Sequence, residues 1–327
     1  MVKVESIYFG GGTPSLLNPE EIDLLTKEVR KKFVTERKAE ITVEANPEDL
    51  TIDYLKRLRE TAVNRVSIGC QSFNESILKM LNRRHTAGQA VESVINTFNA
   101  GFKNISVDLI YGLPGMDTEG LENTLKTALE LPIIHFSAYH LTIERETVFY
   151  KWQQKGKIKP PDDEKSREQY ILLTETARKS GYEHYEISNF AKNGFFSAHN
   201  LIYWLQKMYI GLGPSAHSYD GNTRQWNVSD ISKYIDWLKQ GKTYFEKEVL
   251  DMKMKFNEYL MTRLRTKWGI RKEDIIDRFG EMYYQKVEES ILHNIDAGTM
   301  EYSGKNIRLT EQGMFISDYI LSGLFLS

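Results

Sequence analysis

Short apolar runs alternate with longer amphipathic segments over the first part of the chain. The runs at 6–9, 40–44, 65–68, 104–110, 135–141 and 183–187 are predicted strands. The segments 19–32, 52–60, 87–100 and 121–130 are predicted helices, and the spacing of Ile22, Leu25 and Val29 marks one apolar helix face. Alternation of this kind predicts parallel strands joined by crossover helices.

The ends of four predicted strands carry glycine or polar residues. They are the segments G-G-G-T at 10–13, E-A-N-P at 44–47, G-C-Q-S at 69–72 and D-L-I-Y-G-L-P at 108–114. A (β/α) barrel places its active site at the carboxyl ends of its strands, whereas a doubly wound sheet does so only where the strand order reverses. Four such ends favour an α/β fold of the TIM-type barrel class.

The hydrophobic pattern changes near residue 250. Helical runs at 253–266, 271–279 and 281–297 precede two short strand patterns at 300–302 and 307–309 and a last helix at 311–321. This order predicts a small winged-helix-like α+β domain. Because the segment shows no concentration of basic residues on one helix, we expect it to pack against the barrel rather than to bind nucleic acid.

Composition narrows the class of protein. The 327 residues carry 43 Lys and Arg against 45 Asp and Glu, a net charge of −2, which gives no electrostatic case for nucleic acid or an anionic membrane as the main partner. The single cysteine, Cys70, excludes an internal disulfide. No apolar stretch approaches the length of a transmembrane helix and the amino terminus lacks the apolar core of a signal peptide, so we expect a cytoplasmic location.

Several residues at the strand ends are candidates for chemistry, and each has a plainer alternative. The glycines at 10–12 match neither a dinucleotide fingerprint nor a P-loop, and a tight turn would explain them. Ile41, Val43 and Ala45 share one face of their strand, so Glu44 lies on the other face. If that face is the barrel interior, the buried carboxylate needs a partner. The alternative is that Glu44 is an ordinary surface acid. Equivalent candidates are Gln71, Asp108 and Arg83.

Taken together, these segments resemble a known family. Y-F-G-G-G-T-P-S-L-L, E-A-N-P-E-D-L-T, R-V-S-I-G-C-Q-S-F-N, L-N-R-R-H and V-D-L-I-Y-G-L-P-G come in the order found in the oxygen-independent coproporphyrinogen III oxidase-like radical SAM proteins. The resemblance runs from Ser6 to the carboxyl terminus. It implies a partial radical SAM barrel at 1–190, a barrel extension at 191–250 and the winged-helix-like domain at 251–327.

The resemblance also implies a binding site for S-adenosylmethionine. Arg83 would pair with the carboxylate of its methionyl end, for which a guanidinium fork is suited. The remaining residues that the resemblance places in this pocket are Gly11, Gly12, Thr13, Glu44, Gln71 and Asp108.

The hexamer H-N-L-I-Y-W at 199–204 separates branches of this family. From the residues alone, His199 with Tyr203 and Trp204 is either a packed aromatic patch or a haem face, since imidazole suits iron and flat apolar rings suit the macrocycle. H-N-x-x-Y-W resembles the signature of the haem chaperone branch, in which the histidine is taken to bind haem. His217 in the following segment is a second choice of ligand, or a structural histidine.

The family's C-x-x-x-C-x-x-C motif, whose thiolates hold a [4Fe–4S] cluster, does not occur in this sequence, and Cys70 cannot replace it. We therefore expect this chain not to assemble the cluster and to be inactive as a radical enzyme, and we interpret its amino terminus as a late start. A missing first strand would leave a sheet edge open, and an open edge invites pairing with another chain, as a homodimer or through a swapped element.

The resemblance implies an intact protein that binds haem and delivers it to haem-requiring acceptor proteins, with S-adenosylmethionine and a cluster in its barrel. Association with a membrane would then be peripheral and through those partners. Two alternatives stay open: an oxygen-independent coproporphyrinogen III oxidase that decarboxylates two propionates, and a cluster-free module that binds haem or protein.

Overall fold

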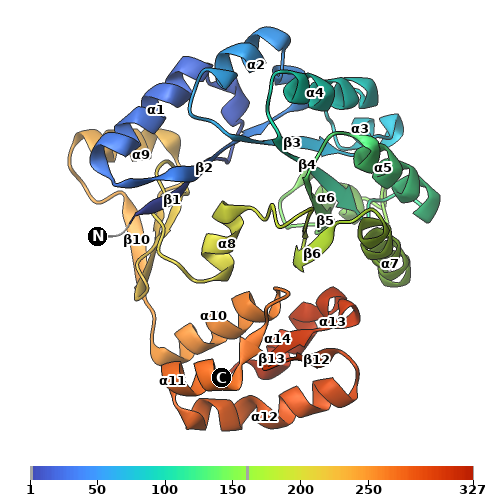
Figure 1. Ribbon diagram of the computed structural model, residues 1–327, viewed down its shortest axis with the longest axis vertical. Coiled ribbons are helices and arrows are strands. Elements are labelled where there is room, and N and C mark those ends of the chain that lie inside the picture. The colour runs from blue at the N-terminus through green and yellow to red at the C-terminus, as the bar shows by residue number, and fades with distance from the viewer. Residues whose placement is uncertain (1–2, 160–161, 327) are drawn as a thin grey trace. The chain divides into compact units, whose positions relative to one another are not determined.

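The computed structural model describes residues 3–159 and 162–326. The chain divides into two compact units, Met1–His199 and Asn200–Ser327 (Figure 1). The first unit contains the glycine-rich strand end and His199, so the predicted site can be described within it.

A curved, mostly parallel sheet forms the first unit. Within the described residues it has seven strands in the order β1-β2-β3-β4-β5-β7-β6, and β1 to β5 pair parallel. Figure 1 shows α1, α2, α4, α5 and α7 along the convex side of this arc. The predicted α/β class and partial barrel are confirmed. The strands are β1 (Val4–Phe9), β2 (Thr35–Ala45), β3 (Arg65–Gln71), β4 (Asn104–Tyr111), β5 (His135–His140), β6 (Glu183–Glu186) and β7 (Asn189–Ala191).

The connecting helices begin where the sequence supplies capping side chains. The Thr51 hydroxyl accepts a hydrogen bond from the Tyr54 amide, and Thr86 forms a capping box with Gln89. The helices of this part of the chain are α1 (Pro19–Lys32), α2 (Ile52–Arg59), α3 (Glu75–Met80), α4 (Ala87–Asn99), α5 (Thr118–Glu130), α6 (Val148–Gln154), α7 (Asp163–Lys179) and α8 (Ala198–Trp204), with 3-10 turns at Pro14–Leu16 and Pro47–Asp49.

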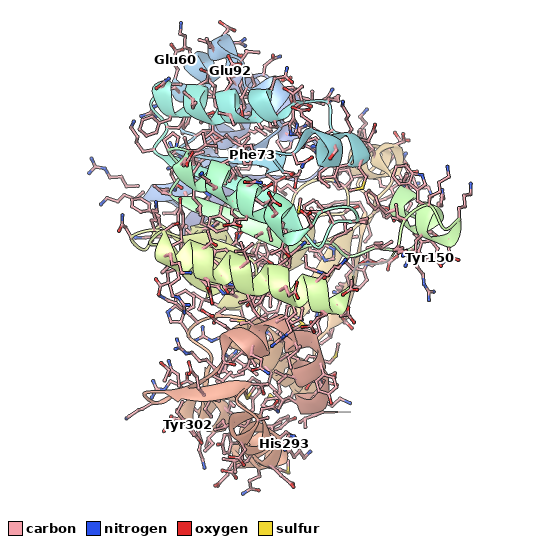
Figure 2. All side chains as sticks on the ribbon, turned by 90° about the vertical axis from the view of Figure 1, so that its right-hand side faces the viewer. Glu60, Phe73, Glu92, Tyr150, His293 and Tyr302 are labelled. Carbon is pink, nitrogen blue, oxygen red and sulfur yellow. The ribbon has the colours of Figure 1, made fainter. Side chains whose placement is uncertain are left out.

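The core of this unit lies between the sheet and its helices. Ile41 and Val43 of β2 are fully buried against the helical layer, and Thr42 and Glu44 take the alternate positions, on the concave face. The opposite side of the helices is charged, as Glu92 on α4 illustrates in Figure 2. The alternation around Glu44 is as predicted.

The last strands of this sheet differ from the expected parallel order. β7 pairs antiparallel with both β5 and β6, so β6 joins the sheet through a hairpin. A three-residue strand such as β7 is too short to show a period in the sequence. Its central residue, Phe190, stacks on Phe136 of β5, and both rings are buried, which explains why the hairpin closes here.

The second unit begins with an antiparallel sheet in the order β10-β9-β8 and continues with helices around the sheet β11-β13-β12. The last predicted helix, 311–321, is two helices, because α13 ends at Phe315 and α14 begins at Ser317. None of the described helices is long and apolar enough to span a bilayer. The elements are β8 (His217–Tyr219), β9 (Thr223–Asn227), α9 (Ile231–Lys239), β10 (Phe245–Val249), α10 (Met252–Leu264), β11 (Ile270–Arg271), α11 (Lys272–Phe279), α12 (Glu281–Asp296), β12 (Met300–Ser303), β13 (Asn306–Leu309), α13 (Glu311–Phe315) and α14 (Ser317–Leu324).

Candidate functional site

The carboxyl ends of β1, β2 and β3 are tied together by the segments that follow them. The Ser15 hydroxyl after β1 donates to Asp49, 2.6 Å away, and accepts from the Asn46 amide after β2. His85, beyond β3, lies 3.2 Å from Glu48 through Nδ1. Three motifs that are far apart in the sequence therefore converge on one rim of the sheet.

The glycine-rich end of β1 has two different requirements for glycine. A side chain at Gly10 would overlap the ring of Tyr8 and lie 3.1 Å from Oε1 of Glu44. Gly11 and Gly12 adopt φ of 72° and 61°, the left-handed region that favours glycine, and a Cβ on either would meet no atom within 4 Å. The first glycine is set by close packing, and the next two leave a turn of exposed backbone.

Glu44 organises this turn from β2. Its Oε1 accepts a 2.6 Å hydrogen bond from the Tyr8 hydroxyl, and its Oε2 accepts one of 3.2 Å from the Gly11 amide. The carboxylate thus has the hydrogen-bonded partners that the sequence required of it on the concave face.

Arg83 reaches the same rim from the segment after α3. Its NH2 group donates to the Asn46 side chain at 2.7 Å and to the Gly69 carbonyl at 2.9 Å. A Cβ on Gly69 would lie 3.0 Å from Nε2 of the Gln71 side chain and 3.4 Å from the Arg83 guanidinium, so both side chains lie close to the bare backbone of this glycine. Gln71 itself holds φ of 64°, which is uncommon for a residue with a side chain.

Asp108 lies on β4 beside Ser67 of β3, whose hydroxyl donates to it at 3.3 Å. Burial raises the pKa of Asp108 to about 6, a hydrogen bond from Ser137 opposes the rise, and the charge of Glu44 adds to it. The two carboxyl groups therefore belong to one electrostatic environment, in which a cationic ligand would be favoured.

His199 lies in the first turn of α8 and contacts β1. Its Nδ1 is 3.0 Å from the Ser6 hydroxyl, and its ring stacks on that of Tyr8, with centroids 4.3 Å apart and planes 12° apart. Burial lowers the pKa of His199 to about 4, so the imidazole is neutral at neutral pH.

A carboxylate on β2 fixes the start of α8. Oε1 of Glu40 accepts from the His199 amide at 3.0 Å, and Oε2 accepts from the Ala198 amide at 3.2 Å. Glu40 is 9% exposed, so these bonds are shielded from water. Glu40 and Glu44 are four residues apart on one strand and share its concave face.

Three residues of this arrangement were missed from the sequence: Ser6, Tyr8 and Glu40. Ser6 and Tyr8 occupy alternate positions of a strand and so share a face, which is the one signal that the sequence carried. The structure brings His199 to β1 and the predicted residues of β2 to β4 to their shared rim. His217 is exposed at the start of β8, with its ring 6.3 Å from that of Trp226, and its ligand role stays a prediction.

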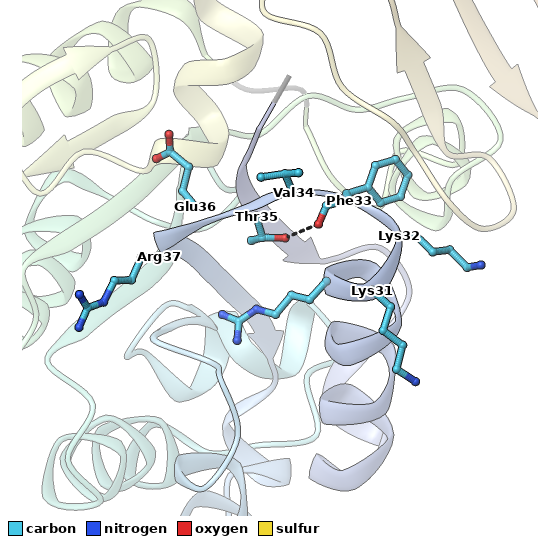
Figure 3. A pocket seen from close by; sticks show the side chains of 8 residues that line it. Lys31, Lys32, Phe33, Val34, Thr35, Glu36 and Arg37 are labelled. Carbon is cyan, nitrogen blue, oxygen red and sulfur yellow. Dashed lines mark hydrogen bonds between the residues drawn. The ribbon is translucent and has the colours of Figure 1, made fainter. Parts of the chain in front are cut away.

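A shallow hollow lies elsewhere, at the turn from α1 into β2 (Figure 3). Residues 30–37 line it, among them the partly exposed Phe33 and Val34, and the hydroxyl of Thr35 donates to the Phe33 carbonyl there. The hollow is at the amino-terminal end of β2, about 30 Å along that strand from Glu44. It is therefore separate from the predicted site.

The rim residues fit S-adenosylmethionine chemically. The ligand carries a carboxylate, an ammonium, a sulfonium and ribose hydroxyls. Nε of Arg83 is buried with no hydrogen-bond partner among the described residues, which suits a carboxylate, and Glu44 and Asp108 suit cations and hydroxyls. A [4Fe–4S] cluster does not fit, because the sequence has the single thiol of Cys70, which is buried and whose pKa is raised by that burial.

Two family models and several known proteins match this chain. Residues 1–128 match the Radical SAM superfamily and residues 250–316 match the HemN C-terminal domain. The chain is 35% identical to "Heme chaperone HemW" of Lactococcus lactis over 99% of its own length and 85% of that protein, and 36% identical to the Bacillus subtilis protein of the same name over 99% and 86%.

A solved structure shares the fold. The coproporphyrinogen III oxidase HemN of Escherichia coli superposes with a TM-score of 0.82 at 22% sequence identity, over 99% of this chain and 78% of HemN. At this identity the match concerns architecture, and it extends over both compact units.

Proposed function

The chain belongs to the radical SAM family of HemW haem chaperones, and from this premise we propose that it binds haem and passes it to haem-requiring acceptor proteins. Two relatives that match 99% of the chain, at 35% and 36% identity, carry the name of haem chaperone. The single observation in the molecule that supports haem binding most strongly is the setting of His199.

His199 has the properties of an iron ligand. A metal-bound histidine must be neutral, and burial already keeps this imidazole neutral at neutral pH. Ligating histidines commonly engage their second ring nitrogen with a hydrogen-bonding group that fixes the ring, and the Ser6 hydroxyl holds Nδ1 in this way. In our proposal Nε2 of His199 coordinates the iron.

The glycine-rich rim is proposed to hold S-adenosylmethionine. Arg83 would receive the methionyl carboxylate, the bare backbone at Gly11 and Gly12 would lie against the methionyl end together with Thr13, and Glu44, Gln71 and Asp108 would line the remainder. Beside a reduced cluster, which the residues of this chain do not hold, this cofactor would supply a 5′-deoxyadenosyl radical. The residues of this chain contribute orientation and charge, and the chain's role in haem binding does not require that chemistry.

The alternative of a coproporphyrinogen III oxidase rests on the shared fold at 22% identity, which carries no substrate assignment. A cytoplasmic location, peripheral contact with a membrane through acceptor proteins, and a homodimer stay predictions.

Titration of the 327-residue chain with haemin tests the proposal. We expect a Soret shift in the wild type and a weakening of haemin binding by at least about 10-fold in His199→Ala. His293→Ala is the matched control, because His293 is an exposed histidine of α12 (Figure 2). Equal spectra for wild type and His199→Ala would refute the ligand role, and a loss confined to His217→Ala would transfer it to His217.

A further inference from the structure

Tyr8 stands between the two parts of the proposed site. One face of its ring stacks on His199, with centroids 4.3 Å apart, and its hydroxyl donates to Glu44 at 2.6 Å. The strand residue two positions on, Gly10, has no side chain, and a Cβ there would overlap the ring. Tyr8 is thus packed against the glycine strand end, the β2 carboxylate and the histidine at the same time.

The contact between Tyr8 and His199 determines the plane of the imidazole. Ser6 holds Nδ1 from one point on β1, and the tyrosine ring, on the same face of that strand, supports the flat side of the histidine. A hydrogen bond to a ring nitrogen leaves the ring free to tilt about that bond, so the stacked ring is needed to fix its orientation. An axial haem ligand requires both its position and its plane.

The position of Tyr8 depends in turn on Glu44. The Tyr8 hydroxyl donates to Oε1 of Glu44, and this hydrogen bond holds the tyrosine ring in place. The other oxygen of Glu44 accepts from the Gly11 amide, at the turn proposed to receive the ligand. A bound ligand whose hydroxyl or ammonium group donates a hydrogen bond to Glu44 therefore competes with Tyr8 for the same acceptor.

We infer that Tyr8 is a positioning residue that links occupancy of the glycine-rich rim to the orientation of His199. A ligand that takes over Glu44 releases the Tyr8 hydroxyl, frees its ring and lowers haem affinity; by linkage, bound haem lowers affinity for that ligand equally. The haem part of this inference rests on the proposed function. S-adenosylmethionine would then favour release of haem rather than its capture.

A double-mutant cycle on haemin affinity tests the link without any second ligand. Tyr8→Phe keeps the stacked ring but removes the hydroxyl, and Glu44→Ala removes its acceptor. We expect each variant to raise the haemin Kd at least about five-fold and the double variant to raise it no further, because both break one bond. Tyr302→Phe, at an exposed tyrosine of β12 (Figure 2), is the control and should leave the Kd unchanged.

A haem-free readout separates this inference from the proposed function. In a chain labelled with ¹⁵N-histidine, the ring resonances of His199 are assigned by their loss in His199→Ala. We expect these resonances to move in Tyr8→Phe and in Glu44→Ala.

A haemin titration in the presence of S-adenosylmethionine tests the link between the two ligands. We expect S-adenosylmethionine to raise the haemin Kd of the wild type but not that of Tyr8→Phe.

Unmoved His199 resonances in both variants would overturn the inference whatever haem does. Additive effects of the two substitutions on haemin Kd would overturn it as well. Moved resonances combined with equal haemin binding by wild type and His199→Ala would support the positioning role of Tyr8 and refute the proposed function instead.

Discussion

Replacement of Glu40 tests how the chain holds the start of α8. The Glu40 carboxylate accepts from the amides of Ala198 and His199, at 3.2 and 3.0 Å, and it is almost fully buried. The first-turn amides of a helix have no partner within the helix. In Glu40→Ala these donors lose a charged acceptor that water replaces poorly on the concave face of the sheet.

The magnitude follows from the two bonds. A hydrogen bond to a charged group contributes about 1.5–3 kcal/mol, and loss of a helix cap costs about 0.5–2 kcal/mol. Because the two amides share one carboxylate and regain part of their solvation, we expect Glu40→Ala to destabilise the first turn by about 2–4 kcal/mol. Glu40→Gln retains one acceptor oxygen and should cost about half as much.

Hydrogen exchange of the His199 amide is the suitable assay, because it reports local opening. A loss of 2 kcal/mol corresponds to exchange about 30-fold faster. Glu36→Ala, at an exposed position of the same strand, is the control and should stay within about 0.5 kcal/mol of the wild type. Exchange of His199 in Glu40→Ala at the wild-type rate would refute the capping role of Glu40.

Two further substitutions make separate predictions about stability. Gly269→Ala should destabilise the chain by more than about 3 kcal/mol in urea unfolding, because φ is 60° and the new Cβ would overlap the Ile307 carbonyl. Gly241→Ala is the control: its φ is 65° but the space around it is open, so it should cost about 1–2 kcal/mol. Equal costs for the two substitutions would contradict this prediction. Because the pKa of Asp108 is raised to about 6 in the folded chain, its ionisation should lower the free energy of unfolding as pH rises from about 4 to 6. Asp108→Asn should therefore be about 3 kcal/mol more stable than the wild type above pH 7 and equally stable at pH 3. A difference in unfolding free energy that does not change with pH would contradict this prediction.

The elements that could be predicted from the sequence are those with a long, regular hydrophobic pattern or with residues that clearly end a helix or strand. Helix α1 begins and ends as expected, because Asn18 caps a regular amphipathic run and Phe33 leaves it. Strand β9, T-R-Q-W-N at 223–227, was missed because it carries no apolar alternation. It is placed by its antiparallel pairing with β8 and β10, which the pattern of the strand itself does not show.

Some residues of the predicted site could likewise be identified from the sequence, and others could not. Glu44 and Asp108 could be chosen from the sequence because a carboxylate within an apolar strand is unusual. Their partners could not, since Ser6 and His199 meet across 193 positions and Glu40 is one acid among many. Pairings of this kind depend on how β1, β2 and α8 are placed by the sheet, which no local pattern encodes.

The most direct measurement of the central claim is to locate the iron in the haem-loaded chain by anomalous X-ray scattering at the iron absorption edge. We expect an iron peak at bonding distance from Nε2 of His199, with Nδ1 still at the Ser6 hydroxyl. A haem-loaded chain whose iron lies at His217, or at any position beyond reach of His199, would contradict it.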